Sequence, residues 1–199
     1  LAAARTIGLF RDTTEHAMNI GIYGGTFDPP HIGHLILAQS AIDALELDHV
    51  LLVPAWRSPF KSESDSLPPL QRAEMVELAI SGNSLLRGEY CEIERGEVSY
   101  TVDTLRKIRD AHPGDTLFLL MGADTFSEFH LWKDPEEILS LATPAVAGRP
   151  VHQLTEDDYP FVKAARQFSM PLIDVSSTDI RKRVHDGRSI QYLVPWTVQ

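Results

Sequence analysis

Short apolar runs alternate along the chain with longer segments in which apolar residues recur every three or four positions. Continuous runs of this kind, ended by glycine, proline or polar residues, are typical of strands buried on both faces of a parallel sheet. The pattern predicts strands at residues 20–23, 50–53, 90–94, 117–121, 145–147 and 172–175.

The segments between these runs carry the helical period, and several have start or stop signals. Pro113-Gly114 and Gly187 follow two of them, and Asp134 precedes Pro135 as the cap of another. Proline favours the first helical position and glycine the position just past a helix end. Helices are therefore predicted at residues 35–45, 69–80, 101–111, from Pro135 onward, at 161–168, and from Thr178 to just before Gly187.

Strands and helices alternate without an internal repeat, which predicts one α/β domain. Its expected architecture is a doubly wound parallel sheet covered by helices on both faces. The first strand begins two residues after Met18, so residues 18–199 are expected to form the domain. For the same reason, residues 1–17 are expected to be an upstream extension outside the fold, and they lack the long apolar stretch of a secretory signal.

Polar or glycine-rich segments follow four of the predicted strands directly. Ligands of such folds bind beyond the carboxyl ends of the strands. The four segments are therefore expected to meet at one edge of the sheet and form the site: Gly24-Gly25, Pro54-Ala55-Trp56, Gly122-Ala123-Asp124 and Ser176-Ser177-Thr178.

The most informative segment is residues 24–34, GGTFDPPHIGH, between the first strand and the first helix. Glycines let backbone amides approach a ligand, and a helix N-terminus presents unpaired N–H groups and partial positive charge. His31 and His34 are three residues apart, so both can reach one phosphate chain. The alternatives are a tight turn with two capping histidines, or a metal site, for which two histidines are too few. The segment predicts a phosphate site.

A second candidate anion site lies at residues 175–183, VSSTDIRKR. Ser177 or Thr178 can cap the helix, and Arg181 lies close enough to bind phosphate oxygens. Taken alone, the segment is equally compatible with an ordinary capped helix that has a basic, solvated face.

Composition restricts the classes of partner. The chain has 199 residues and a formal net charge of −10, which argues against general binding of nucleic acid or anionic membranes. No apolar run approaches membrane-spanning length. Cys91 is the only cysteine, which fits a reducing, cytoplasmic location. Any phosphate ligand must therefore be held by local positive charge.

Taken together, the segments resemble a known group of enzymes. Residues 24–34 resemble the T/HxGH signature of the nucleotidylyltransferase superfamily, and residues 176–181 resemble its ISSTxIR signature. Three further stretches resemble bacterial nicotinate-nucleotide adenylyltransferases: residues 95–105, 122–132 and 189–195. The resemblance runs in order from Met18 to the end of the chain and implies a Rossmann-like nucleotidylyltransferase fold.

The resemblance also implies roles for individual residues. His31, His34, Arg181 and Lys61 would be catalytic. The ATP-binding residues would be Gly24, Gly25, Thr26, Phe27, His34, Gly122, Asp124, Ser177, Thr178 and Arg181. Nicotinate mononucleotide would be bound by Tyr100, Thr101, Asp124, Trp132 and Lys61, with Trp132 stacked on the pyridine ring. A core tryptophan and a turn-capping aspartate are the plain alternatives for Trp132 and Asp124.

One departure from the family pattern concerns the loop after the second strand. The family usually has Pro-His-Lys there, whereas this chain has Pro59-Phe60-Lys61. Lys61 can still contribute charge to a phosphate, but the histidine is replaced by Phe60. The C-terminal helix that the family places after Val194-Pro195 also stops at Gln199. Neither departure touches the two phosphate signatures.

The implied reaction belongs to NAD biosynthesis: the adenylyl group of ATP is transferred to nicotinate mononucleotide, giving nicotinate adenine dinucleotide and pyrophosphate. Magnesium is expected on the ATP phosphates rather than in a protein site, because the sequence offers no cluster of carboxylates. The alternatives are an adenylyltransferase that acts on nicotinamide mononucleotide or phosphopantetheine, and a catalytically silent nucleotide-binding regulator. Residues 99–105 and 122–132 disfavour phosphopantetheine. The expected partners are ATP and nicotinate mononucleotide, without nucleic acid or membrane, and the sequence leaves a homo-oligomer open.

Overall fold

The computed structural model describes residues 17–60, 66–148 and 161–199. This part of the chain forms a six-stranded sheet, in which every strand pairs with its neighbours in parallel, in the order β3-β2-β1-β4-β5-β6. The strands are β1 (Asn19–Gly25), β2 (His49–Pro54), β3 (Leu86–Gly88), β4 (Thr116–Gly122), β5 (Thr143–Gly148) and β6 (Arg166–Ser169). The expected doubly wound parallel sheet is confirmed.

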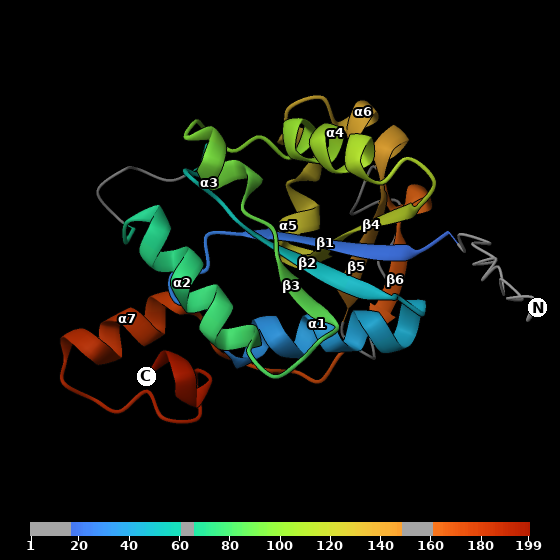
Figure 1. The fold of residues 1–199 in the computed structure, drawn as a ribbon. Coiled ribbons are helices and arrows are strands. Elements are labelled where there is room, and N and C mark those ends of the chain that lie inside the picture. Colours follow the sequence, from blue (N-terminus) through green and yellow to red (C-terminus); the bar gives the residue numbers. More distant parts are fainter. Residues whose placement is uncertain (1–16, 61–65, 149–160) are drawn as a thin grey trace, which may run out of the picture.

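Helices cover both faces of this sheet (Figure 1). Helices α3, α4 and α6 lie on one side, and α1 and α2 lie on the other. The helices are α1 (Ile32–Leu45), α2 (Pro69–Ile80), α3 (Cys91–Arg95), α4 (Thr101–Ala111), α5 (Ala123–Ser127), α6 (Pro135–Leu141) and α7 (Ser177–His185), with 3-10 turns η2 (Phe129–Leu131), η3 (Val162–Ala164) and η4 (Trp196–Val198).

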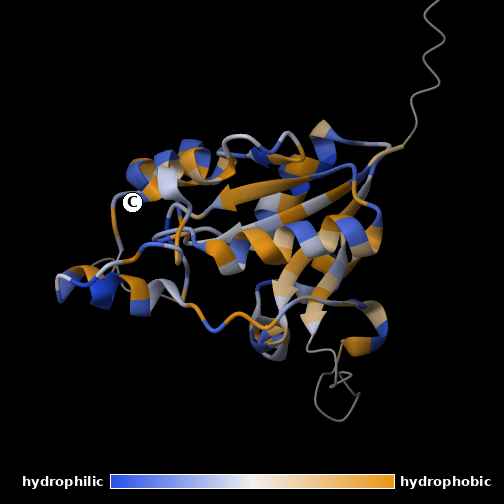
Figure 2. Ribbon diagram, turned by 90° about the horizontal axis from the view of Figure 1, so that it is seen from below, coloured by the Kyte–Doolittle hydropathy of each residue, from blue (hydrophilic) through white to orange (hydrophobic). Residues whose placement is uncertain are grey.

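The strands are buried on both faces, which explains their continuous apolar sequences. In β2, Leu51 and Val53 belong to the core shared with α4, whereas Val50 and Leu52 belong to the core shared with α1. All four side chains are at most 7% exposed. Figure 2 shows the same contrast, with mainly hydrophobic strands between helices that alternate hydrophobic and hydrophilic residues.

The direction of winding reverses between β1 and β4, which are neighbours at the centre of the sheet. Beyond the carboxyl ends of such a central pair lies the crevice in which doubly wound folds bind ligands. Here β1 ends at Gly25 and β4 at Gly122. The topology therefore places both predicted glycine segments at the switch point.

Three element predictions are wrong. Residues 90–94 were expected to be a strand, but α3 occupies this place and the strand β3 precedes it. Five residues are too few to distinguish a helical from an extended period. Residues 161–168 were expected to be a helix, but they contain η3 and the start of β6.

The predicted strand at residues 172–175 is also wrong, because these residues have no regular structure. Leu172 is 70% exposed, and β6 already occupies the edge of the sheet. The edge strand β6 escaped prediction because Phe168 is its only buried side chain. A single buried residue produces no detectable period.

The predicted cap of α6 is wrong in its chemistry. Asp134 does occupy the N-cap position before Pro135, but its side chain makes no capping hydrogen bond, and its backbone is left-handed, with φ of 52°. The helices predicted at 69–80 and 101–111 agree with α2 and α4 residue for residue. The predicted extension 1–17 lies outside the described residues except for its last one.

Candidate active site

The turn after β1 leads directly into α1 and forms the first wall of the site. A side chain added at Gly24 would meet no atom within 4 Å, so this backbone borders open space. At the start of α1, His31 is the N-cap residue and His34 is the third helical residue. Two of the first amides of α1 are bonded within the protein, because the N–H of Ile32 donates to the Leu193 carbonyl and that of His34 to the His31 carbonyl, both at 3.0 Å.

The two histidines form a stacked pair. Their ring centroids are 3.7 Å apart, with 24° between the ring planes. The Nδ1 atom of His34 accepts a hydrogen bond from the backbone N–H of His31 at 3.1 Å. In a neutral imidazole, the proton must then lie on Nε2. The edge-on ring of Phe27 packs against His34 with centroids 5.0 Å apart. His34 is thereby fixed as a donor at Nε2.

His31 is the more buried member of the pair, at 8% exposure. Burial lowers the pKa of His31 to about 4, because an imidazolium would lose its hydration. The ring is therefore neutral at physiological pH. Its Nδ1 is buried without a hydrogen-bond partner.

Helix α7 packs against the segment that links the β1 turn to α1. Ser177 Oγ donates to the carbonyl of Pro29 at 2.9 Å, and Arg181 Nη1 donates to the carbonyl of Asp28 at 2.8 Å. The cap of α7 is Ser176, whose Oγ accepts from the N–H of Asp179. The expectation that Ser177 or Thr178 caps this helix is wrong. Ser177 instead binds the backbone of the segment between β1 and α1.

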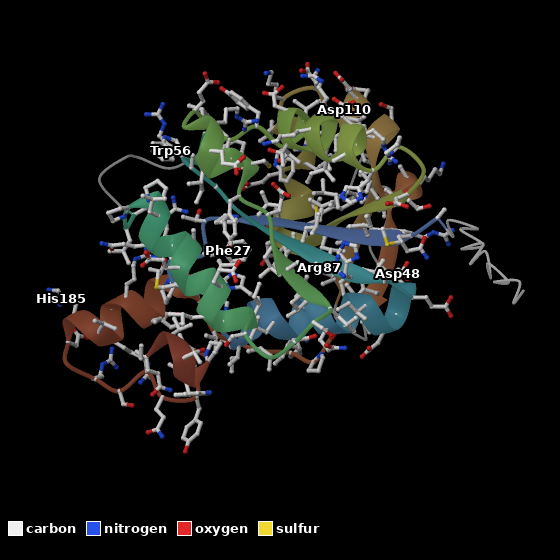
Figure 3. All side chains as sticks on the ribbon, viewed as in Figure 1. Phe27, Asp48, Trp56, Arg87, Asp110 and His185 are labelled. Carbon is white, nitrogen blue, oxygen red and sulfur yellow. The ribbon has the colours of Figure 1, made fainter. Side chains whose placement is uncertain are left out.

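A cavity of about 620 Å³ opens at the carboxyl ends of the central strands. Figure 3 shows Trp56 and Asp48 at opposite ends of β2, with Trp56 at the end where this site lies. Eight of the predicted site residues line the cavity: Gly24, Gly25, Thr26, His34, Tyr100, Thr101, Gly122 and Trp132. Phe60, the departure from the family pattern, also lines it and is 63% exposed.

The other predicted residues lie elsewhere. Six do not line the cavity: Phe27, His31, Asp124, Ser177, Thr178 and Arg181. Phe27 and His31 support His34 from behind, and Ser177 and Arg181 bind the adjoining Asp28-Pro29 backbone. Asp124 is exposed in the first turn of α5. Lys61 lies outside the described residues.

The comparisons with known proteins agree with this geometry. Residues 22–183 match a family model described as cytidylyltransferase-like, and this span runs from β1 through most of α7. The chain belongs to the cytidylyltransferase-like family.

Several relatives of this cytidylyltransferase-like chain carry the name "Probable nicotinate-nucleotide adenylyltransferase". One protein of Thermus thermophilus is 41% identical over 182 residues, which cover 92% of this chain and 95% of the relative. The Lactiplantibacillus plantarum protein is 40% identical over 179 residues, covering 90% and 82%. The Plasmodium falciparum nicotinic acid mononucleotide adenylyltransferase, solved with NaAD, has a TM-score of 0.73 at 21% identity, covering 91% and 93%, and shares the fold.

Several residues that line the cavity of this cytidylyltransferase-like chain were not assigned a role from sequence, among them Glu92, Ser99, Thr104 and Lys133. Thr104 lies beside Val102 and Leu105 on the buried side of α4. A polar residue on the apolar side of a predicted helix was the sequence signal that could have identified it. Glu92 gave no such signal, because its short helix was mistaken for a strand. Lys133 Nζ lies 4.6 Å from the centroid of the Tyr100 ring.

Two kinds of feature are absent from the described ranges 17–60, 66–148 and 161–199. No group of three or more His, Cys, Asp or Glu side chains there is arranged to hold a metal ion. No helix in these ranges combines the length and apolar character needed to cross a membrane.

Proposed function

We propose that this protein transfers the adenylyl group of ATP to nicotinate mononucleotide, releasing pyrophosphate and forming nicotinate adenine dinucleotide. The observation that carries the proposal is the cavity itself: the phosphate turn of β1 and α1 and the N-terminus of α4 both border it, with Trp132 beside them. One wall suits a triphosphate, and the other suits an aromatic ring bearing a carboxylate.

The chemistry needs no nucleophilic side chain. A phosphate oxygen of nicotinate mononucleotide, already ionised at neutral pH, attacks the α-phosphorus of ATP. The new P–O bond forms as the bond to the β-phosphate oxygen breaks, and pyrophosphate leaves with its electron pair. Catalysis then consists of aligning two anions and stabilising the charge on the transferring group.

His34 is the central residue of the phosphate wall. The proton on its Nε2, a position set by the hydrogen bond at Nδ1, is proposed to be donated to a phosphate oxygen. Gly24 leaves room for the phosphates to approach the backbone. Arg181 supplies positive charge beside the Asp28 carbonyl, and Lys61 is proposed to act from the neighbouring loop. His31 is proposed to act through the stacked ring of His34, since its own Nδ1 is buried and the residue does not line the cavity.

At the other wall, Tyr100 is the N-cap of α4 and Thr101 its first residue, and the first amides of this helix are proposed to meet the nicotinate carboxylate. Trp132 is proposed to stack on the pyridine ring. Lys133 adds positive charge next to Tyr100, although it also pairs with Asp103 at 3.2 Å. Asp124 is proposed to meet a ribose hydroxyl. Magnesium enters as the MgATP substrate, held by phosphate oxygens and water.

The test is pyrophosphate release from MgATP with nicotinate mononucleotide, nicotinamide mononucleotide or phosphopantetheine, each supplied alone. Charge-assisted bonds to the carboxylate of about 1.5–3 kcal/mol predict a preference for the acid over the amide of about ten- to a hundredfold. A preference for the amide would overturn the carboxylate site at α4. If pyrophosphate is released with none of the three acceptors, the proposed activity is contradicted.

A further inference from the structure

A chain of polar side chains lies buried beneath the cavity. Its members are Glu92 on α3, Ser99 in the following loop and Thr104 on α4, with exposures of 6%, 9% and 3%. A carboxylate is seldom buried without strong partners, because dehydration disfavours its charge. The placement of Glu92 under a proposed anion site therefore calls for a structural explanation.

Glu92 accepts hydrogen bonds from both hydroxyls. Thr104 Oγ1 donates to Glu92 Oε1 at 2.6 Å, and Ser99 also bonds to the Glu92 side chain. Ser99 Oγ at the same time accepts from the backbone N–H of Trp56 at 3.0 Å. Because a hydroxyl has a single proton, the proton of Ser99 must point to the carboxylate. The three bonds form one directed chain.

The two hydroxyls bracket the N-terminus of α4. Ser99 comes just before Tyr100 and Thr101, and Thr104 lies one turn further into the helix. The hydrogen bonds of Glu92 with Ser99 and Thr104 thus hold α4 on both sides of the amides proposed to meet the nicotinate carboxylate. A helix held at these two points has a fixed direction for its first N–H groups.

The chain continues to the phosphate wall. The carbonyl of Trp56 accepts from Arg72 Nη2 at 2.9 Å, and Arg72 Nη1 donates to the carbonyl of Thr26 at 2.7 Å. Burial raises the pKa of Glu92, while the hydrogen bonds from Ser99 and Thr104 and the charges of Arg95 and Arg72 oppose the rise. Glu92 is the acceptor toward which the hydroxyls of Ser99 and Thr104 converge.

We propose that Glu92 is a positioning residue for nicotinate mononucleotide: by holding Ser99 and Thr104, it aims the first amides of α4 at the pyridine carboxylate. This inference rests on the proposed function of the site. It assigns to Glu92 an effect on one substrate rather than on both. Small misplacements of binding groups reduce rates and affinities strongly, up to about a hundredfold per ångström.

The experiment compares steady-state constants of Glu92→Ala with those of wild type. We expect the KM for nicotinate mononucleotide to rise about tenfold, with kcat and the KM for ATP changing by less than about twofold. Glu92→Gln keeps an acceptor oxygen and should restore most of the wild-type KM. Glu94→Ala is the matched control, because Glu94 lies on the same helix with its side chain 69% exposed.

A merely structural role is distinguished by a double-mutant cycle with Thr104→Val. If Glu92 acts through Thr104, the two single changes raise the same KM and their effects do not multiply in the double variant. Equal rises of both KM values in Glu92→Ala, or effects that multiply, would overturn the proposal. If Glu92→Ala does not fold, Thr104→Val alone must still raise the KM for nicotinate mononucleotide selectively, and an unchanged KM refutes it.

Failure of this inference is separable from failure of the proposed function. Wild-type protein that does not turn over nicotinate mononucleotide contradicts the function. Wild-type turnover with an unchanged KM in folded Glu92→Ala contradicts only the role of Glu92.

Discussion

His34 has two separable roles, one as a helix-capping acceptor and one as a proposed phosphate donor, and two substitutions can distinguish them. Its Nδ1 accepts the N–H of His31 at the start of α1, while its Nε2 proton is proposed to meet a phosphate. The side-chain oxygen of His34→Asn can take the place of Nδ1 but leaves no donor at Nε2. The amide nitrogen of His34→Gln can take the place of Nε2 but leaves no acceptor near His31.

The expected magnitudes follow from these contacts. Loss of one donor to the transferring group costs about 2.7–4 kcal/mol of transition-state stabilisation, so the kcat of His34→Asn should fall at least about a hundredfold. Its stability should stay near wild type, because the cap is kept. His34→Gln should retain more activity but lose about 1 kcal/mol of stability with the cap. For a chain of this size, that loss lowers the Tm by about 2–4 °C.

The assay is pyrophosphate release at saturating MgATP and nicotinate mononucleotide, with thermal unfolding of the same samples. Both variants lose the ring that stacks on His31, so this shared loss cancels in their comparison. A His34→Asn protein that keeps more than about a tenth of the wild-type kcat would refute the donor role. Equal stability of both variants would refute the capping role.

Three further outcomes follow from the same contacts. Gly33→Ala places a Cβ 3.1 Å from the His31 ring and should reduce kcat about tenfold. In the control Gly114→Ala, the added Cβ meets nothing within 4 Å, so kcat should be unchanged. Equal kcat values of the two variants would contradict the idea that the Cβ displaces the His31 ring. Arg72→Met removes the guanidinium that donates to three backbone carbonyls. The free energy of unfolding, measured in urea, should fall by about 3 kcal/mol or more. A loss below about 1 kcal/mol would contradict the importance of these hydrogen bonds for stability. The pKa of His31 is about 4 when folded and near 6.5 when unfolded, so the unfolded state binds more protons between these values. Stability should therefore decrease by up to about 3 kcal/mol as pH falls from 6.5 to 4, and His31→Asn should show a flatter profile in urea titrations at several pH values.

Sequence prediction succeeded where a segment carries a repeated physical signal. Helix α4 was predicted within its true bounds because Val102, Leu105 and Ile108 recur at the helical period and are all buried. It failed for α3 and β6, whose few residues carry too little periodicity to separate helix from strand. The error at α3 also concealed Glu92.

The predictions of site residues also succeeded only in part. Gly24, His34, Tyr100 and Trp132 were predicted as site residues, and the fold brings all four to one cavity. Asp124 was predicted with them, but it is exposed and does not line the cavity, although Gly122 and Thr125 do. Position along the chain fixes the strand end at which a residue lies, whereas the direction of its side chain depends on packing with distant elements.

By itself, the sequence determined the alternation of strands and helices, the parallel sheet and the glycine turn that precedes the first helix, because periodicity and turn chemistry are local properties. Only the tertiary structure decided that His31 is buried and neutral, that Ser177 binds Pro29, and that Glu92 lies beneath α4. These features depend on desolvation and on hydrogen bonds between residues far apart in the chain. No local pattern encodes them, since they arise when separate elements pack together.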